Sequence, residues 1–155
     1  MSRIRKASIK DIAQIRVLIN DFAKDDLMLP RSLNELYETV RDFWVCEDKG
    51  KILGCCALHI CWDTLAEIKS LAVRSGQQGR GIGSELVQYC IDEALGLEVK
   101  KIFVLTYQSE FFKKFHFRRV KHEALPHKIW AECINCPKFP GCNEIAMVKE
   151  LKKTK

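Results

Sequence analysis

The sequence predicts a single α/β domain spanning residues 1–155, long enough to bury a substantial core. Two observations predict this class. Segments whose apolar residues recur at helical spacing alternate along the chain with short apolar runs of strand length. Within residues 66–107, a strand pattern, a helix pattern and a second strand pattern follow one another. Such a crossover joins parallel strands.

The chain opens with a predicted strand at residues 4–8 ("IRKAS"), and a helix follows at once. Ser8 and Asp11 have the spacing of a capping box at the start of that helix. The apolar stripe of this helix is expected to bury Ile12, Ile15, Ile19 and Phe22.

A second helix is expected after the break "DDLMLPR", where Ser32 and Glu35 repeat the capping-box spacing. Its inner stripe consists of Leu33, Leu36, Val40 and Phe43. The pattern therefore predicts one continuous helix that reaches Phe43.

A hairpin, a crossover and a closing pair of strands make up the rest of the prediction. The hairpin occupies residues 44–62 and turns at Asp48, Lys49 and Gly50. The later elements are a strand at 66–73, a helix at 84–95, a strand at 100–107, a short helix at 109–115, and strands at 117–120 and 143–151. A cysteine-bearing insertion, at about 127–143, lies between the last two strands.

Composition excludes several classes of function. The net charge of +6 is modest, and the lysine-rich end at 149–155 ("KELKKTK") accounts for about half of it. The remaining excess is too scattered for a nucleic-acid partner and suits a small polyanion better. The sequence shows no membrane-length apolar run and no signal-peptide pattern, so we expect a cytoplasmic protein without a membrane partner.

Eight cysteines in a chain without an export signal are not expected to form a disulfide framework. The cysteines in apolar surroundings are expected to be core thiols. These are Cys46, Cys55, Cys56, Cys61 and Cys90.

The stretch "VRSGQQGRGIGSEL" (73–86) places Gly79, Gly81 and Gly83 around Arg80, between an apolar run and a helix pattern. The start of a helix presents unpaired N–H groups and partial positive charge, and glycines allow positive φ and close approach of a ligand. The stretch therefore predicts an anion site, with a glycine turn that holds no ligand as the alternative.

Two phosphate motifs do not fit. A nucleotide P-loop needs Lys and then Ser or Thr after its last glycine, and the dinucleotide fingerprint needs a glycine where Ser84 stands. The remaining pattern, Gln78-x-x-Gly81-x-Gly83, resembles the acetyl-CoA pyrophosphate loop of the GNAT acetyltransferases.

The resemblance covers nearly the whole chain. Glu67 stands eleven residues before Gln78, where that family often carries its catalytic glutamate, and "FFKKFHF" (111–117) replaces a family pattern like F-Y-x-x-x-G-F. A narrower resemblance, carried by "LPRSLNELYETVRDFWVCE", "AEIKSLAV" and "ALPHKIW", is to the acetyltransferase domain of N-acetylglutamate synthases. It implies transfer of acetyl to the α-amine of L-glutamate in arginine biosynthesis. The kinase-like domain of longer synthases is absent from this sequence, which puts arginine regulation in doubt.

The resemblance implies a GNAT fold, a mixed central sheet flanked by helices, with acetyl-CoA as acetyl donor. Glu67 is the implied general base, and a strand-end surface carboxylate is the alternative. The acetyl-CoA contacts are expected from backbone groups of Leu71, Ala72, Val73, Gln78, Gly79, Arg80, Gly81, Ile82, Gly83 and Ser84. Strand alternation would place Glu67, Lys69, Leu71 and Val73 on one face.

A dicarboxylate acceptor needs cationic anchors, and Arg31 and Lys69 are the candidates, with ordinary solvated charges as the alternative. Phe112 stands where many relatives have a tyrosine and cannot donate a proton. The general acid therefore stays open among Tyr107, His116, water and an unassisted thiolate.

Cys133, Cys136 and Cys142, with His127, could complete a structural zinc site, and a thiol-bearing loop without metal is the alternative. Three further alternatives stay open. The acceptor could be another amino acid, a polyamine or a protein amine, the chain could bind CoA without turnover, and it could form a homodimer.

Overall fold

The structure is a computed structural model, and it describes residues 2–24, 31–125 and 144–151. The strands are β1 (Arg3–Lys6), β2 (Phe43–Asp48), β3 (Lys51–Trp62), β4 (Leu65–Val73), β5 (Lys101–Thr106), β6 (Arg118–Val120) and β7 (Ile145–Glu150). The helices are α1 (Ile12–Lys24), α2 (Leu33–Glu38), α3 (Ile82–Gly96) and α4 (Ser109–Lys113), with short 3₁₀ turns η1 (Ile9–Asp11), η2 (Val40–Asp42) and η3 (His122–Ala124).

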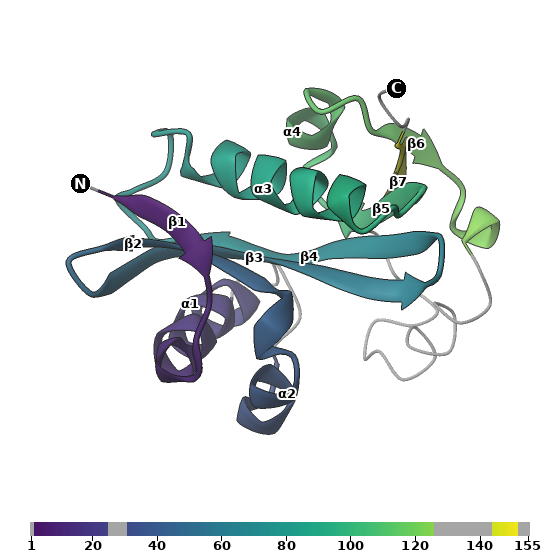
Figure 1. Cartoon of the computed structure of the whole chain (residues 1–155). Helices are drawn as coiled ribbons and strands as arrows, with labels where there is room; N and C mark the ends of the chain where they lie inside the picture. Colours follow the sequence, from purple (N-terminus) through teal and green to yellow (C-terminus); the bar gives the residue numbers. More distant parts are fainter. Residues whose placement is uncertain (1, 25–30, 126–143, 152–155) are drawn as a thin grey trace. The chain divides into compact units, whose positions relative to one another are not determined.

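The strands hydrogen-bond in the order β1-β2-β3-β4-β5-β7-β6 as a seven-stranded sheet (Figure 1). β4 and β5 are parallel, as the crossover pattern predicted, whereas the pairs β1–β2, β2–β3, β5–β7 and β6–β7 are antiparallel. The mixed sheet flanked by helices is confirmed. The chain groups into two compact units, Met1–His59 with Ile68–Glu93 and Ile60–Glu67 with Ala94–Lys155.

In the first unit, α1 and α2 cover one face of β1–β4, and α3 lies on the other face (Figure 1). The core on the α1 side is a cluster of fully or nearly fully buried apolar side chains that includes Ile12, Ile15, Ile19, Leu36, Phe43 and Val45. The helical spacing of the isoleucines therefore identified the buried stripe of α1 correctly.

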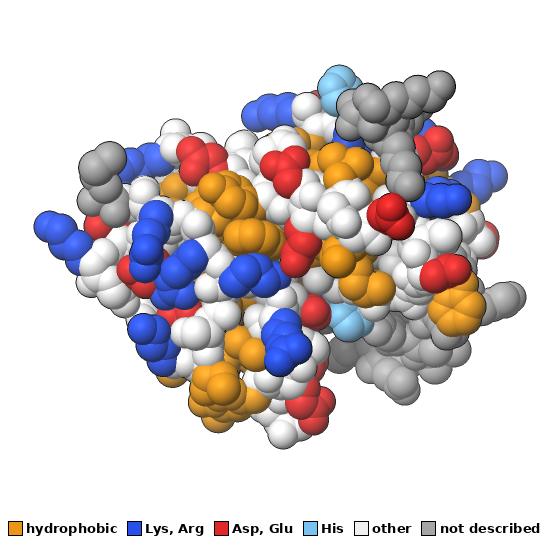
Figure 2. All heavy atoms as spheres, in the orientation of Figure 1, with side chains coloured by type: hydrophobic (Ala, Val, Ile, Leu, Met, Phe, Trp, Pro, Cys, Tyr) orange, Lys and Arg blue, Asp and Glu red, His pale blue; other side chains and the backbone are white. Residues whose placement is uncertain are grey.

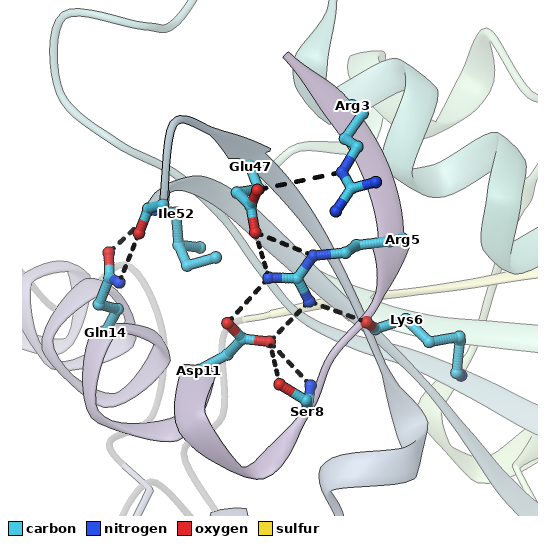
Figure 3. A network of polar contacts seen from close by, with 9 residues as sticks. Arg3, Arg5, Lys6, Ser8, Asp11, Gln14, Glu47 and Ile52 are labelled. Carbon is cyan, nitrogen blue, oxygen red and sulfur yellow. Dashed lines mark hydrogen bonds and ion pairs between the residues drawn. The ribbon is translucent and has the colours of Figure 1, made fainter.

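A polar network joins β1, η1 and β2 (Figure 3). Arg5 donates to both carboxylate oxygens of Asp11, at 2.8 and 3.0 Å, and also to Glu47. Asp11 in turn accepts the backbone N–H of Ser8 at 2.7 Å, which confirms the predicted capping box. Burial alone would raise the pKa of Asp11, but the bonds from Arg5 and Ser8 outweigh it and hold that pKa below its usual range.

The hairpin turn is held from outside as well as by its own backbone. Lys49 and Gly50 both have positive φ, at 51° and 82°, as tight hairpin turns require. Gln14 of α1 accepts the N–H of Ile52 at 2.9 Å and donates to the carbonyl of Gly50 at 3.0 Å (Figure 3). The first helix thereby fixes the position of the turn.

The second helix is shorter than its apolar stripe predicted. α2 ends at Glu38, η2 follows, and Phe43 is the first residue of β2. Thr39 ends the helix, because its backbone leaves the helical region and its hydroxyl donates to the carbonyl of Glu35 at 2.8 Å. Leu33 is 39% exposed and does not belong to the inner stripe.

In the second unit, β5 pairs with β7 along its whole length, from Lys101↔Glu150 to Thr106↔Ile145. Its core contains Leu65, Phe103, Leu125, Ala146 and Val148. The aromatic segment around α4 packs its own rings, with centroids of Phe112 and Phe117 5.4 Å apart.

The core thiols are confirmed for most of the cysteines in question. Cys46, Cys55, Cys56 and Cys90 are buried and form no disulfide, and Cys61 is partly buried. Burial raises the pKa of Cys55 to about 12, so this thiol stays protonated.

On the face drawn in Figure 2, lysine and arginine side chains are interspersed with acidic ones. In the part of the chain that the structure describes, no helix combines the length and apolarity needed to cross a membrane.

Candidate functional site

The glycine loop connects β4 to α3 and is anchored at its first residue. The N–H of Arg74 donates to the carbonyl of Leu53 at 2.7 Å, and its guanidinium donates twice to the carbonyl of Ile52, at 3.1 and 2.9 Å. Within the loop, Arg80 donates to the side chain of Gln77 at 2.8 Å. The start of the loop is therefore tied to β3.

Three glycines of this loop have positive φ, namely Gly76 (87°), Gly79 (81°) and Gly81 (83°). A Cβ at any of them would meet no heavy atom within 4 Å, so the backbone conformation, not crowding, requires glycine here. Gly83 instead lies within α3, and Gly76 was not among the glycines predicted for the site.

The loop presents backbone N–H groups at the start of α3. The helical hydrogen bonds begin with the N–H of Glu85 donating to the carbonyl of Gly81 at 3.0 Å. Among the described backbone–backbone hydrogen bonds that lie outside helices and strands, none is donated by an N–H group of residues 78–84. Because α3 is fifteen residues long, these N–H groups lie at the positive end of a substantial helix dipole.

Close packing against β3 sets the position of that helix start. A Cβ on Gly54 would lie 3.1 Å from both Ile82 and Leu86 and 3.2 Å from the carbonyl oxygen of Ala72. Ile82 and Leu86 are buried, so the first turn of α3 sits on the bare backbone of Gly54. This glycine was not among the sequence-predicted site residues, although a glycine inside a strand pattern is a signal of close approach.

Glu67 is a buried carboxylate on β4, with 8% of its surface exposed. It lies opposite Phe103 in the parallel ladder, which consists of the pairs Leu65↔Lys101, Ala66↔Ile102 and Glu67↔Phe103. Glu67↔Phe103 is the last of these pairs along β4. The predicted base therefore belongs to the last pair of the ladder.

Ser70 interrupts the regular strand conformation of β4. Its φ is 58°, a left-handed conformation that is uncommon for a residue other than glycine. Ala72 is 2% exposed and packs in the core, whereas Leu71 and Val73 are only partly buried. The expectation that Glu67, Lys69, Leu71 and Val73 share one face stays a prediction at this irregular strand.

Arg31 lies against this interruption. It is buried, and it donates to Glu35 (2.8 Å), Ser70 (3.2 Å) and Thr39 (3.1 Å). Its guanidinium carbon lies 5.4 Å from the ring centre of Phe43. These bonds use three of the five N–H groups of the guanidinium.

A histidine–carboxylate pair that no sequence motif predicted belongs to the same unit. Nδ1 of His59 lies 2.7 Å from Oδ2 of Asp42, and both side chains are partly exposed. The carboxylate fixes the ring orientation of the histidine. The one available signal was a histidine within the otherwise apolar strand "ILGCCALHICW".

The structure of the aromatic segment explains one difference between "FFKKFHF" and the family pattern F-Y-x-x-x-G-F. His116 stands where the pattern has glycine, and its φ is 67°. The position therefore adopts the conformation that glycine favours, while the histidine side chain is exposed. Phe112 is 2% exposed and has no proton to donate.

The predicted metal residues Cys133, Cys136 and Cys142, with His127, lie outside the described residues. Within the described ranges, no group of three or more His, Cys, Asp or Glu side chains is arranged to hold a metal ion.

The partly buried Lys69, the second predicted anchor, lies one residue before Ser70 on β4.

Comparisons with known proteins give a family and several relatives. Residues 9–117 match the model of the acetyltransferase (GNAT) family. An uncharacterized N-acetyltransferase of Chlorobaculum tepidum is 42% identical over 149 residues, 96% of either chain. An amino-acid acetyltransferase of Mycobacterium tuberculosis is 34% identical over 132 residues, which cover 83% of this chain and 75% of the relative.

Two solved structures resemble the fold closely. Rv2747 from Mycobacterium tuberculosis, in complex with CoA and NLQ, has a TM-score of 0.85 and 28% identity, covering 97% of this chain and 99% of the other. N-acetylglutamate synthase from Neisseria gonorrhoeae, complexed with coenzyme A and N-acetyl-glutamate, has a TM-score of 0.89 and 28% identity. The similarity to the synthase covers 99% of this chain and 36% of that longer one.

Proposed function

This chain belongs to the GNAT acetyltransferase family, and we propose that it transfers the acetyl group of acetyl-CoA to the α-amine of L-glutamate. The relative from Mycobacterium tuberculosis named as an amino-acid acetyltransferase supports an amino acid as acceptor. The synthase complexed with coenzyme A and N-acetyl-glutamate supports both the donor and glutamate.

The observation that carries the proposal is the path of one strand. β4 holds the buried carboxylate of Glu67 where its ladder with β5 ends, and it then leads directly into a loop of positive-φ glycines at the start of α3. A pyrophosphate needs several N–H donors without a competing acceptor, and residues 78–84 offer them. An amine acceptor needs a base, and a carboxylate on the same strand is suited to that role.

The proposed chemistry is a direct transfer. Glu67 takes a proton from the acceptor ammonium, through a water molecule, and the neutral amine attacks the thioester carbonyl carbon. The C–S bond breaks and the CoA thiolate leaves, while the nitrogen loses its second proton and the thiolate is protonated. Backbone groups of Leu71–Val73, at the end of β4, would bind the acetyl and pantetheine amides. Phe112 cannot act as the acid, so Tyr107, His116 and water stay open for that role, with an unassisted thiolate as the fourth alternative.

Arg31 and Lys69 are the proposed anchors for the two carboxylates of the acceptor. Arg31 is held by bonds from two elements, so its remaining N–H groups are fixed in direction before an acceptor arrives. A fixed guanidinium binds a carboxylate with little further loss of side-chain entropy.

A thiol-release assay with acetyl-CoA and a panel of amines tests the proposal. L-Glutamate should give a higher kcat/KM than other amino acids, polyamines or a lysine peptide. Arg31→Ala should raise the KM for glutamate by about tenfold or more, whereas Arg41→Ala, which removes an exposed arginine of η2, should change it little. Arg31→Lys keeps the positive charge and serves as a second variant if Arg31→Ala does not fold. If a different amine is acetylated and glutamate is not, that amine replaces glutamate as the proposed acceptor. If no amine causes thiol release, the chain is a CoA-binding module without turnover.

A further inference from the structure

Arg31 already holds a carboxylate of its own chain. Its Nε donates to Oε1 of Glu35, one helical turn away, at 2.8 Å. The side chain of Arg31 is 7% exposed and is also held by Ser70 and Thr39, whereas that of Glu35 is 48% exposed. Glu35 is therefore the partner that can move away, because ion pairs with an exposed member are weak.

The carboxylate of Glu35 is free to pair in this way because of how α2 starts. In a full capping box, Glu35 would bind back to the N–H of Ser32. Here Ser32 accepts the N–H of Glu35 at 3.1 Å, which is half of the box, and the carboxylate of Glu35 binds Arg31 instead. The helix start thus survives without the charge of Glu35.

The pair changes what Arg31 offers to a ligand. With Glu35 at Nε, the positive charge of the guanidinium is already compensated, and an incoming carboxylate meets a like charge close by. The incoming carboxylate must displace Glu35 or bind beside it. Glu35 is part of the same chain and therefore competes at a high effective concentration. A higher concentration of free carboxylate is then needed to occupy Arg31.

We infer that Glu35 is a specificity-determining residue that competes with the side-chain carboxylate of the acceptor for Arg31. The inference rests on the proposed function. It implies that this chain favours glutamate over glutamine less strongly than its arginine alone would allow, because a neutral side chain leaves the Arg31–Glu35 pair intact.

The variant Glu35→Gln tests this with almost no change in shape. Its backbone N–H still reaches Ser32, and only the negative charge is lost. We expect the KM for L-glutamate to fall by about fivefold, the scale of an exposed ion pair. The KM for L-glutamine and for acetyl-CoA should stay within about twofold. Glu38→Gln, an exposed charge on the same helix that is bonded to Asn34 at 3.1 Å, is the matched control and should leave all three values unchanged.

A second readout does not depend on turnover. Calorimetry with glutarate, a dicarboxylate without an amine, should show tighter binding to Glu35→Gln than to wild type, and no such gain for Glu38→Gln. An unchanged or higher glutamate KM in Glu35→Gln would overturn the inference, because Glu35 would then orient Arg31. If wild type acetylates no amino acid, the proposed function fails, and a gain in glutarate binding by Glu35→Gln would still support the competition. The absence of that gain would refute it.

Discussion

Replacing Gly54 with alanine should weaken acetyl-CoA binding without touching the loop itself. The added Cβ would lie 3.1 Å from Ile82 Cγ2 and Leu86 Cδ1 and 3.2 Å from the carbonyl oxygen of Ala72. All three contacts are a few tenths of an ångström too short, and the neighbours are buried. The first turn of α3 must therefore shift, at a cost of roughly 1–3 kcal/mol in the free energy of unfolding.

The same shift moves the N–H groups of the loop, because Ile82 follows Gly81 directly. A misplaced hydrogen bond to a charged group costs about 1–2 kcal/mol, so the KM for acetyl-CoA should rise about tenfold. Initial rates of thiol release at saturating acceptor measure that KM, and urea unfolding measures stability.

Gly50→Ala is the matched control for lost stability. This hairpin glycine has a φ of 82°, and a Cβ added to it would meet no heavy atom within 4 Å. Alanine there costs roughly 1–2 kcal/mol of backbone strain but leaves α3 in place. If both variants raise the KM equally, or if Gly54→Ala leaves it unchanged, the reasoning from close packing is refuted.

Three further outcomes are expected. Glu67→Gln should lower kcat by ~10²–10⁴-fold at neutral pH, with partial recovery as rising pH deprotonates the amine, and an unchanged kcat would remove Glu67 from the role of base. Arg5 holds the pKa values of Asp11 and Glu47 below their ordinary values of 3.8 and 4.5. The stability that these carboxylates contribute is therefore present above those ordinary values and is lost as pH falls through the lower pKa values of the folded state. Urea unfolding of Arg5→Met over this acid range should therefore show a shallower loss of stability than wild type, and equal slopes would contradict the network's role. Alkylation of the native protein followed by peptide mass spectrometry should leave Cys55 unmodified, since burial keeps it protonated, and rapid labelling before unfolding would contradict this.

The local patterns predicted most of the fold. The isoleucine spacing identified the buried face of α1, and the succession of patterns at 66–107 identified the parallel pair β4–β5. Both are short-range signals, which depend on residues within a few turns or on the connection between two neighbouring strands. The second helix was overextended because Phe43 continues the helical spacing even though Thr39 ends the helix.

The candidate site was only partly predictable. The glycine motif and Glu67 could be found because their spacing along one segment carries the signal. The left-handed conformation of Ser70 could not be predicted, because no feature of the neighbouring sequence indicates it. The pairing of Asp42 with His59 joins residues far apart in the sequence, and neither residue has a distinctive spacing.

The sequence by itself determined the family, the order of helices and strands, and the glycines on which an anion loop depends, because each follows from spacing within one stretch of chain. Only the tertiary structure decided that Arg31 is buried against Ser70, and that Gly54 supports the first turn of α3. Burial and pairing arise when separate segments pack together, and a side chain's neighbours across such a contact leave no periodic trace in the sequence.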